Sequence, residues 1–303
     1  MKKDLVSISD VSADEIASLF SLALAIKAGK QGHGGLPNKT LAMIFEKPSL
    51  RTRVTFETGM TQMGGHAIYL GPTDVLMGKR ESVPDVARNL SRWVDGIMAR
   101  TFSHQAVVDL ARHATVPVIN ALTDRAHPCQ ALAFGLTMLE HCSSLKGLRV
   151  VFVGDGNNVA HSLMLMAPKV GMDFVLACPE GYQADDQISV QARRLAEEYG
   201  TVFEITEDPL KAVRKADVIY ADVWASMGQE EEQEIRSQVF RPYQINRELL
   251  REAKEGCLVT HCLPAHRGEE ITGEILDGPQ SIAFDEAENR LHIQKAIMLR
   301  LMG

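Results

Sequence analysis

Long hydrophobic runs are absent from this 303-residue sequence, and none approaches the roughly 20 apolar residues that a helix needs to cross a bilayer. The N-terminal stretch MKKDL lacks the apolar core of a signal peptide and the amphipathic, Arg- and Ser-rich character of a transit peptide. We therefore expect no membrane partner and a cytoplasmic location.

Cysteine is scarce and irregularly spaced. The chain has five cysteines, an odd number, and no C-x-x-C pair, which argues against a disulfide framework and against a structural zinc site. We expect a buried free thiol at each position, namely Cys129, Cys142, Cys178, Cys257 and Cys262.

Positive charge is in deficit. The sequence has 32 Lys and Arg residues against 39 Asp and Glu residues, for a formal net charge of −7 at pH 7. This balance argues against a nucleic-acid partner, although a local basic pocket is compatible with it. The composition is that of a globular protein, and 303 residues exceed one ordinary core, so we expect two domains with a cleft between them.

Helical and strand patterns alternate along the chain. Ser12 and Glu15 form a capping box ahead of an amphipathic helix, and short apolar runs typical of buried parallel strands recur after it. The expected strands cover residues 40–45, 67–70, 96–100, 117–120, 148–153, 174–177, 202–205, 218–221 and 258–260.

This alternation predicts an α/β fold with two doubly wound parallel-sheet domains and an active-site cleft between them. The linker-like sequence SSLKG at residues 143–147 places the boundary, which gives domains over residues 1–142 and 143–286. A final helix from about Glu286, within residues 287–303, is apolar enough to pack back on the first domain.

Residues 45–53, FEKPSLRTR, are typical of an anion-binding turn. A strand that stops at Pro48 and opens a helix presents backbone N–H groups and the positive end of the helix dipole. Ser49 and Thr52 add hydroxyl groups, while Arg51 and Arg53 add planar guanidinium groups that suit phosphate or carboxylate. Taken alone, the turn is better explained as a solvated helix start with two surface arginines.

Other polar residues follow the expected strands, at the sheet edge where open α/β folds bind ligands. They are Arg100 and Thr101, His127 and Gln130, Asn157 and Asn158, residues 222–228, and residues 261–264. Each has a structural alternative, such as a surface ion pair or a helix cap. Their common position in the fold is what favours a site.

Two other chemistries compete for these residues. Gly154-x-Gly156-x-x-Val159 resembles part of a dinucleotide fingerprint, but Val159 replaces the third glycine and two asparagine side chains stand where a pyrophosphate needs bare backbone. Cys262 beside His261 suggests a thiol nucleophile, but adjacent strand residues point to opposite faces, which places His261 badly as its base.

Together these motifs resemble the ornithine branch of the aspartate/ornithine carbamoyltransferase family, over nearly the whole chain. The matching segments are residues 45–53, 95–101 (DGIMART), 127–130 (HPCQ), 154–158, 222–228 (DVWASMG), 261–264 (HCLP) and 288–290 (ENR). The S-x-R-T-R and H-P-x-Q motifs resemble the carbamoyl phosphate half shared across the family. The D-x-x-x-S-M-G and H-C-L-P motifs resemble the ornithine half.

The resemblance implies transfer of the carbamoyl group of carbamoyl phosphate to the δ-amine of L-ornithine, giving L-citrulline and phosphate, as in arginine biosynthesis. It implies no metal or redox cofactor, and a homotrimer or a multiple of trimers. Within the family the alternative is a carbamoyltransferase for a related amine, putrescine or an N-acylated ornithine. Outside it, a nicotinamide dehydrogenase and a noncatalytic amino-acid-binding protein stay open.

The resemblance also implies residue roles. The residues implied to bind carbamoyl phosphate are Ser49, Leu50, Arg51, Thr52, Arg100, His127, Gln130 and Arg290. Arg290 is expected at the start of the final helix, from where it reaches across the domains. For ornithine binding the roles fall on Asn158, Asp222, Ser226, Met227, Cys262 and Leu263. The catalytic roles fall on Arg51, Arg100, His127 and Cys262, and Cys262 orients the amine rather than attacking.

Two positions depart from the family pattern. Many members have Thr at the position of Leu50, so one hydroxyl that bonds the phosphate is missing, at a cost on the order of 1 kcal/mol. Many bacterial members have Gln at the position of Leu76, which reaches a neighbouring subunit's phosphate. Leu at position 50 also occurs in acylornithine relatives, whereas the intact SMG at residues 226–228 favours free ornithine.

Overall fold

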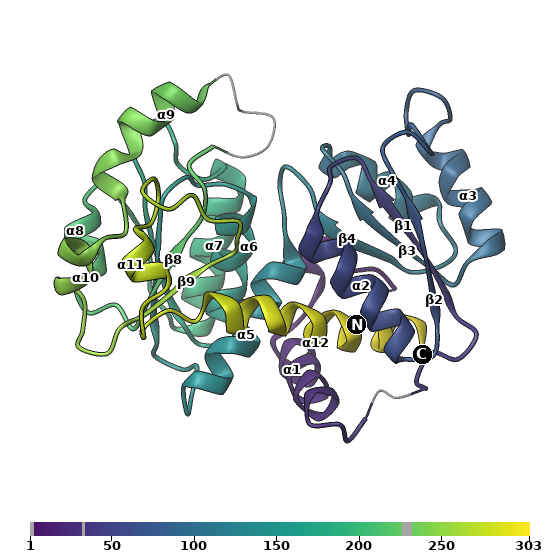
Figure 1. Cartoon of the computed structure of the whole chain (residues 1–303), viewed down its shortest axis with the longest axis horizontal. Helices are drawn as coiled ribbons and strands as arrows, with labels where there is room; N and C mark the ends of the chain where they lie inside the picture. Colours follow the sequence, from purple (N-terminus) through teal and green to yellow (C-terminus); the bar gives the residue numbers. More distant parts are fainter. Residues whose placement is uncertain (1–2, 32–33, 226–231) are drawn as a thin grey trace. The chain divides into compact units, whose positions relative to one another are not determined.

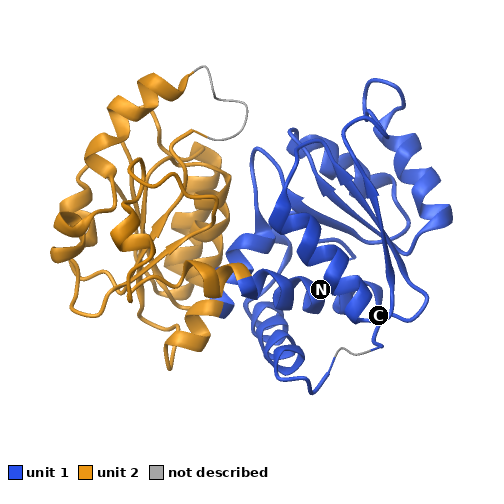
Figure 2. Cartoon of the chain, in the orientation of Figure 1, with its two compact units in different colours: residues 1–136, 288–303 blue, residues 137–287 orange. Residues whose placement is uncertain are grey.

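The computed structural model describes residues 3–31, 34–225 and 232–303. The chain forms two compact units, coloured separately in Figure 2. Unit 1 comprises residues 1–136 and 288–303, and unit 2 comprises residues 137–287. The helices α5 (Pro128–His141) and α12 (Ala283–Met302) each contain one of the boundaries. The α/β fold with two parallel-sheet domains is confirmed.

Unit 1 is built on a four-stranded parallel sheet with the order β2-β1-β3-β4. Its strands are β1 (Thr40–Phe45), β2 (His66–Leu70), β3 (Gly96–Arg100) and β4 (Val118–Leu122). The chain winds outward from β1 to β2 on one side and continues through β3 to β4 on the other. The carboxyl ends of β1 and β3 therefore flank the point where the winding reverses, which is where open α/β sheets bind ligands.

Helices cover both faces of this sheet (Figure 1). They are α1 (Ala13–Lys27), α2 (Leu50–Gln62), α3 (Val83–Trp93), α4 (His104–His113) and the unit 1 part of α12. One apolar cluster joins alternate strand residues such as Ala42 and Ile97 to Val86 of α3 and Leu110 of α4. The expected capping box is confirmed, since Ser12 and Glu15 each accept a hydrogen bond from the other's backbone N–H at the start of α1.

Unit 2 is built on a five-stranded parallel sheet with the order β7-β6-β5-β8-β9. Its strands are β5 (Arg149–Val153), β6 (Asp173–Ala177), β7 (Phe203–Thr206), β8 (Val218–Ala221) and β9 (Leu258–His261). The winding reverses between β5 and β8, so the loops after these two strands meet at the second ligand-binding edge.

Helices also cover both faces of the unit 2 sheet (Figure 1). They are α6 (Asn158–Lys169), α7 (Asp186–Tyr199), α8 (Pro209–Val213), α9 (Gln233–Phe240), α10 (Arg247–Arg251) and α11 (Gly273–Leu276). Short 3-10 turns lie at Ile8–Asp10 and Arg241–Tyr243. In the part of the chain that the structure describes, no helix combines the length and the apolar character needed to cross a membrane.

Several expectations about burial and boundaries were wrong. The last helix begins at Ala283 rather than near Glu286, so Arg290 lies about two turns inside α12. Cys142 and Cys262 are half-buried, whereas Cys129 is fully buried and burial raises the pKa of its thiol to about 12. Cys142 is partly exposed because it follows α5 at the start of the surface linker.

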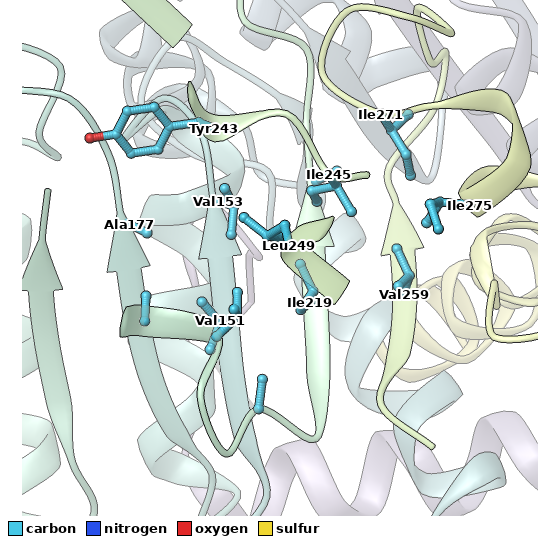
Figure 3. Packing of buried hydrophobic residues seen from close by; sticks show 14 of the residues in the cluster. Val151, Val153, Ala177, Ile219, Tyr243, Ile245, Leu249, Val259, Ile271 and Ile275 are labelled. Carbon is cyan, nitrogen blue, oxygen red and sulfur yellow. The ribbon is translucent and has the colours of Figure 1, made fainter. Parts of the chain in front are cut away.

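One face of the unit 2 sheet carries a large apolar core. Figure 3 shows the side chains of Val151, Ile219 and Val259 on neighbouring strands, with those of Leu249 and Ile271 close by. These side chains are almost completely buried. Their alternation along each strand follows the period of two that a pleated sheet imposes.

From the packing of this core we predict how much Ile219 contributes to the free energy of unfolding. Its side chain is fully buried, so Ile219→Ala should lower the free energy of unfolding by about 2–5 kcal/mol through lost burial and a residual cavity. The matched control is Ile235→Ala in α9, where the same change at a 62 % exposed side chain should cost less than about 0.5 kcal/mol. Urea denaturation measures both, and equal losses would contradict the packing described.

Candidate active site

The expected anion turn of unit 1 forms the start of α2. Ser49 is in an extended conformation, with φ −161°, and its hydroxyl accepts a hydrogen bond of 3.3 Å from the backbone N–H of Thr52. Ser49 therefore caps the helix, whose first residue is Leu50. The positive end of the helix dipole lies at the carboxyl edge of the sheet, because α2 directly follows β1. The Leu50 side chain, at the first position of the helix, is 75 % exposed.

Two buried arginines converge on Thr52. The Thr52 hydroxyl oxygen accepts hydrogen bonds from Nη1 of Arg100 at 3.5 Å and from Nη2 of Arg290 at 3.3 Å. Nη1 of Arg290 also donates to the Gln130 side-chain oxygen. Residues from α2, β3, α5 and α12 thus meet in one cluster. Hydroxyl and amide groups are among the partners that hold the two guanidinium groups in place, and two guanidinium groups beside a helix start suit a bound anion.

Gln294 supports Arg290 from one turn further along α12. With its amide oxygen toward Arg290, this fully buried residue accepts hydrogen bonds of 3.1 Å from Nε and Nη2 of the arginine. Its amide nitrogen then donates to the Thr55 hydroxyl at 2.6 Å. Arg290 is therefore fixed on two sides, by Gln130 and by Gln294.

His127 lies buried just ahead of α5, beside these cations. Burial lowers the pKa of its imidazole well below the ordinary value near 6.5, and the positive charges of Arg290, Arg100 and Arg51 lower it further. The imidazole is therefore neutral at physiological pH. In this state it offers an N–H donor while leaving the positive charge of the cluster on the arginines.

Arg53 does not join the cluster, although the sequence placed it in the anion turn. Its Nε donates to the Glu57 carboxylate at 3.0 Å, one turn along α2, and its guanidinium group lies 3.9 Å from the centre of the Tyr69 ring. The side chain lies along the exposed side of the helix because the i, i+4 ion pair and the aromatic face hold it there.

In unit 2 the carboxylate of Asp222, directly after β8, is the centre of a second cluster. Its Oδ1 accepts hydrogen bonds from the Cys262 thiol at 2.7 Å and from the Val223 N–H at 2.8 Å. Its Oδ2 accepts one from the Asn157 amide at 2.7 Å. The Asn157 oxygen meanwhile caps α6 by accepting from the N–H groups of Val159 and Ala160. Asn157 therefore joins the helix start to the carboxylate.

The loop after β9 presents Cys262 and Leu263. Leu263 has a φ of 55°, and its N–H donates to Nδ1 of His261 at 2.8 Å. Because Nδ1 accepts this bond, the ring proton sits on Nε2, which lies 3.0 Å from the Glu270 carboxylate. The Cys262 sulfur is 3.9 Å from Nδ1 and donates to Asp222 instead. His261 thus fixes the loop backbone by accepting the N–H of Leu263, and it does not serve as a base for the Cys262 thiol.

Arg236 of α9 holds the loop that contains Asp222. Its Nη1 donates to the Trp224 carbonyl at 2.9 Å and pairs with the Asp155 carboxylate at 3.0 Å, and its Nε pairs with Glu232 at 2.9 Å. Burial raises the pKa of Asp155 to about 6, against the opposing effect of the Arg236 charge. Two loops after neighbouring strands are therefore joined through one arginine.

The sequence-predicted residues thus gather in two groups, one in each unit. The unit 1 group contains Ser49, Leu50, Arg51, Thr52, Arg100, His127, Gln130 and Arg290. The unit 2 group contains Asp222, Cys262 and Leu263, with Asn158 as the first residue of α6. Ser226 and Met227 lie outside the described residues.

Sequence reasoning missed three supporting groups. These are Asn157 as a partner of Asp222, Gln294 as a holder of Arg290, and the pair of His261 and Glu270 behind Leu263. Asn157 stood among the polar residues expected at the sheet edge, but its bond to Asp222 was not foreseen. The amide of Gln294 among the apolar residues of the last helix was a further signal, and the structure shows this residue fully buried.

The geometry after β5 also bears on the dinucleotide alternative. A Cβ on Gly156 would lie 2.3 Å from the Ala184 nitrogen, so this glycine serves a close approach within the protein. The first N–H groups of α6 are bonded to the Asn157 side chain, which removes the donors that a pyrophosphate uses at a helix start. This arrangement disfavours a nicotinamide cofactor at the site.

Comparison with known proteins matches both units. Residues 3–140 match the family model "Aspartate/ornithine carbamoyltransferase, carbamoyl-P binding domain", and residues 146–301 match "Aspartate/ornithine carbamoyltransferase, Asp/Orn binding domain". The chain is 52 % identical over 304 residues to the anabolic ornithine carbamoyltransferase of Pyrococcus furiosus, covering 99 % of this chain and 96 % of the relative. It is 50 % identical over 299 residues to the ornithine carbamoyltransferase of Methanobrevibacter smithii, covering 99 % of both.

Solved structures agree with this match. The Pyrococcus furiosus ornithine carbamoyltransferase structure gives a TM-score of 0.96 at 53 % identity, covering 99 % of this chain and 97 % of that chain. The Thermus thermophilus ornithine carbamoyltransferase structure gives a TM-score of 0.90 at 46 % identity, covering 100 % of both chains.

The neutral state of His127 predicts a pH effect on stability. The unfolded chain binds a proton on this residue below about pH 6.5, whereas the folded protein binds it only at much lower pH, so stability should fall as the pH drops below about 6.5. His127→Gln should flatten this dependence by up to about 1.4 kcal/mol per pH unit, as measured by urea denaturation from pH 5 to 7.5. The control is His66→Gln at an exposed histidine. An unchanged slope in His127→Gln would refute the assignment.

Proposed function

The chain belongs to the aspartate/ornithine carbamoyltransferase family, and we propose that it transfers the carbamoyl group of carbamoyl phosphate to the δ-amine of L-ornithine, giving L-citrulline and phosphate. The observation that carries this proposal is the cluster at the start of α2, where Arg100 and Arg290 converge on Thr52 beside a neutral His127. Such a cluster matches a dianionic substrate that also carries a carbonyl and an amide nitrogen.

In this proposal the phosphate of carbamoyl phosphate binds at the N-terminus of α2. The Ser49 hydroxyl, the backbone at Leu50 and the side chains of Arg51 and Thr52 surround it, and Arg100 adds a second guanidinium group. These donors stabilise the charge that grows on the phosphate oxygen as the bond to the carbamoyl carbon breaks. The exposed Leu50 side chain contributes no donor, so the backbone N–H groups carry that part of the binding.

The carbamoyl group lies toward the interior of the same cluster. The Thr52 hydroxyl, Arg100 and the N–H of neutral His127 polarise its carbonyl oxygen as the carbon becomes tetrahedral. Gln130 holds the carbamoyl amine, and Arg290 keeps Gln130 in position while adding a further cation. A protonated His127 would bring another positive charge among the arginines, which its burial opposes.

Ornithine binds to the unit 2 group in this proposal. Asp222 accepts a hydrogen bond from the α-ammonium group, and Asn158 with Ser226 and Met227 holds the rest of the α-amino acid end. Cys262 and the Leu263 carbonyl orient the δ-amine. The hydrogen bonds that Asp222 accepts from Asn157 and Cys262 leave lone pairs on its two oxygens for a substrate donor.

The chemical step is a direct displacement. The δ-amine must be neutral, because an ammonium group has no lone pair with which to attack the carbonyl carbon. A C–N bond forms, the C–O bond to phosphate breaks, phosphate leaves, and the nitrogen loses a proton. No enzyme-bound carbamoyl group forms, so Cys262 keeps its thiol throughout.

The wider assignments follow from the family. We propose that residues 1–142 with the helix 287–303 form the carbamoyl phosphate domain and residues 143–286 the ornithine domain. A homotrimer or a multiple of trimers, a cytoplasmic location and a place in arginine metabolism complete the proposal. Exposed apolar side chains of unit 1, among them Leu76 and Trp93, are available for contacts between copies.

Substrate choice tests the proposal. With carbamoyl phosphate present, kcat/KM for carbamoylation should be at least about tenfold higher with L-ornithine than with putrescine or N-acetylornithine, since only ornithine satisfies both Asp222 and the δ-amine position. Product analysis by mass spectrometry measures all three reactions. The matched variant Arg51→Ala should lose most activity with every amine. Equal or better turnover of putrescine would overturn the assignment to ornithine.

A substitution at Leu50 tests the proposed phosphate site independently of the choice of amine. Leu50→Thr should lower the KM for carbamoyl phosphate several-fold, because one neutral hydrogen bond to phosphate is worth on the order of 1 kcal/mol. Val54→Thr is the control, since it makes a comparable change at an exposed residue one turn along α2. Initial rates at saturating ornithine give both values. A higher KM in Leu50→Thr would place the phosphate elsewhere.

A further inference from the structure

A cluster of potential metal ligands lies in the loop after β9, further along the chain than Cys262 and Leu263, which take part in the proposed reaction. It consists of His266, Glu269 and Glu270, whose potential ligand atoms all lie within 4.8 Å of one another. Nδ1 of His266 is 3.8 Å from Oε2 of Glu269 and 3.8 Å from Oε2 of Glu270. We call this group the loop cluster.

The decisive member is Glu270, which is only 1 % exposed. Its Oε1 is satisfied, because it accepts hydrogen bonds from Nε2 of His261 at 3.0 Å and from the His266 N–H at 2.6 Å. Its Oε2 is buried and has no hydrogen-bond donor among the residues that the structure describes. A buried carboxylate oxygen without a donor is costly, and this one faces the imidazole nitrogen of His266.

A metal ion would satisfy this oxygen. Ligand atoms around a four-coordinate ion at about 2.0–2.2 Å are separated by roughly 3.4 Å. The observed distances are 3.8 Å from Nδ1 of His266 to each carboxylate and at most 4.8 Å within the whole group. The side chains of His266 and Glu269 are 48 % and 40 % exposed, so both are able to make the small adjustment. Their exposure also leaves room for water at the remaining coordination position.

The donor set indicates which ion. One imidazole nitrogen and two carboxylate oxygens suit divalent first-row metals such as zinc, whereas magnesium and calcium prefer oxygen ligands alone. We propose that the loop cluster is a binding site for a divalent transition metal, with zinc as its representative ligand. The ion has no part in carbamoyl transfer and fixes the loop from its outer side.

The site has a defined connection to the rest of the loop. Glu270 binds the proposed ion through Oε2 while its Oε1 orients His261, and His261 in turn accepts the N–H of Leu263. A ligating carboxylate that also holds a neighbouring group is typical of metal sites with an ordered outer shell. Metal binding should therefore stabilise the folded loop and raise the melting temperature.

Zinc titration of the whole chain tests the proposal. The parent for this experiment is Cys262→Ser, because the thiol of Cys262 with Asp222 offers zinc a competing pair of ligands. After removal of metal with a chelator, isothermal titration calorimetry should detect one zinc ion per chain at the loop cluster, with a rise in melting temperature. No substrate is present, so the result does not depend on the proposed function.

Variants in the same background locate the ion. His266→Ala and Glu269→Gln should each weaken zinc binding by about tenfold or more, since each removes a ligand. His141→Ala is the matched control, because His141 pairs with Asp285 at 2.8 Å outside the loop cluster, and it should leave the affinity unchanged. Absence of zinc binding in the parent, or undiminished binding in His266→Ala, would overturn the proposal. Circular dichroism before titration verifies that each variant is folded.

Discussion

The unit 1 site depends on holding Arg100 and Arg290 close together in a buried position. Two guanidinium groups repel one another, and burial makes the repulsion stronger because less water screens it. The structure supports them with neutral groups from several elements, in particular the Thr52 hydroxyl and the side-chain amides of Gln130 and Gln294. A carboxylate in their place would hold the arginines more firmly, but it would cancel the charge that a dianionic substrate needs.

The same constraint explains why His127 stays neutral. Its position among the cations and away from water makes a protonated ring unfavourable, so the imidazole acts as a dipolar donor. In the carbamoyltransferase reaction such a donor matches the partial charge of a carbonyl oxygen, whereas the full charges of the arginines match the phosphate. The cluster therefore combines full positive charges on the arginines with a neutral donor on His127, and in the proposed reaction this difference orients the substrate.

Much of this arrangement could be predicted from the sequence, because the strands are nearly continuous apolar runs and each is followed by its polar residues. The apolar run at residues 148–153 and the capping box at Ser12 are local signals, and the structure has a strand at Arg149–Val153 and the capping box at the start of α1. The failures concern long-range contacts. Nothing near Arg53 in the sequence reveals that Tyr69 offers it an aromatic face.

The order of the strands in each sheet could not be predicted from the sequence either, because apolar runs of similar composition do not specify which strands pair with one another. The gathering of motifs was still predictable, because the carboxyl ends of all parallel strands share one edge. Their supporting partners, such as Glu270 behind His261, required coordinates, because a buried glutamate in a polar loop looks like any solvated one.

Asn157 shows how closely recognition and folding are joined in this chain. One end of its amide caps α6 and the other end holds Asp222, the residue proposed to select the substrate amine. A redesign that replaces Asp222 to accept a different amine would leave that amide without its acceptor and loosen the first turn of a helix whose first ten residues after Asn158 are buried. In this chain the residue proposed to select the substrate is therefore tied to a helix cap, and laboratory evolution toward a new amine will have to accommodate both.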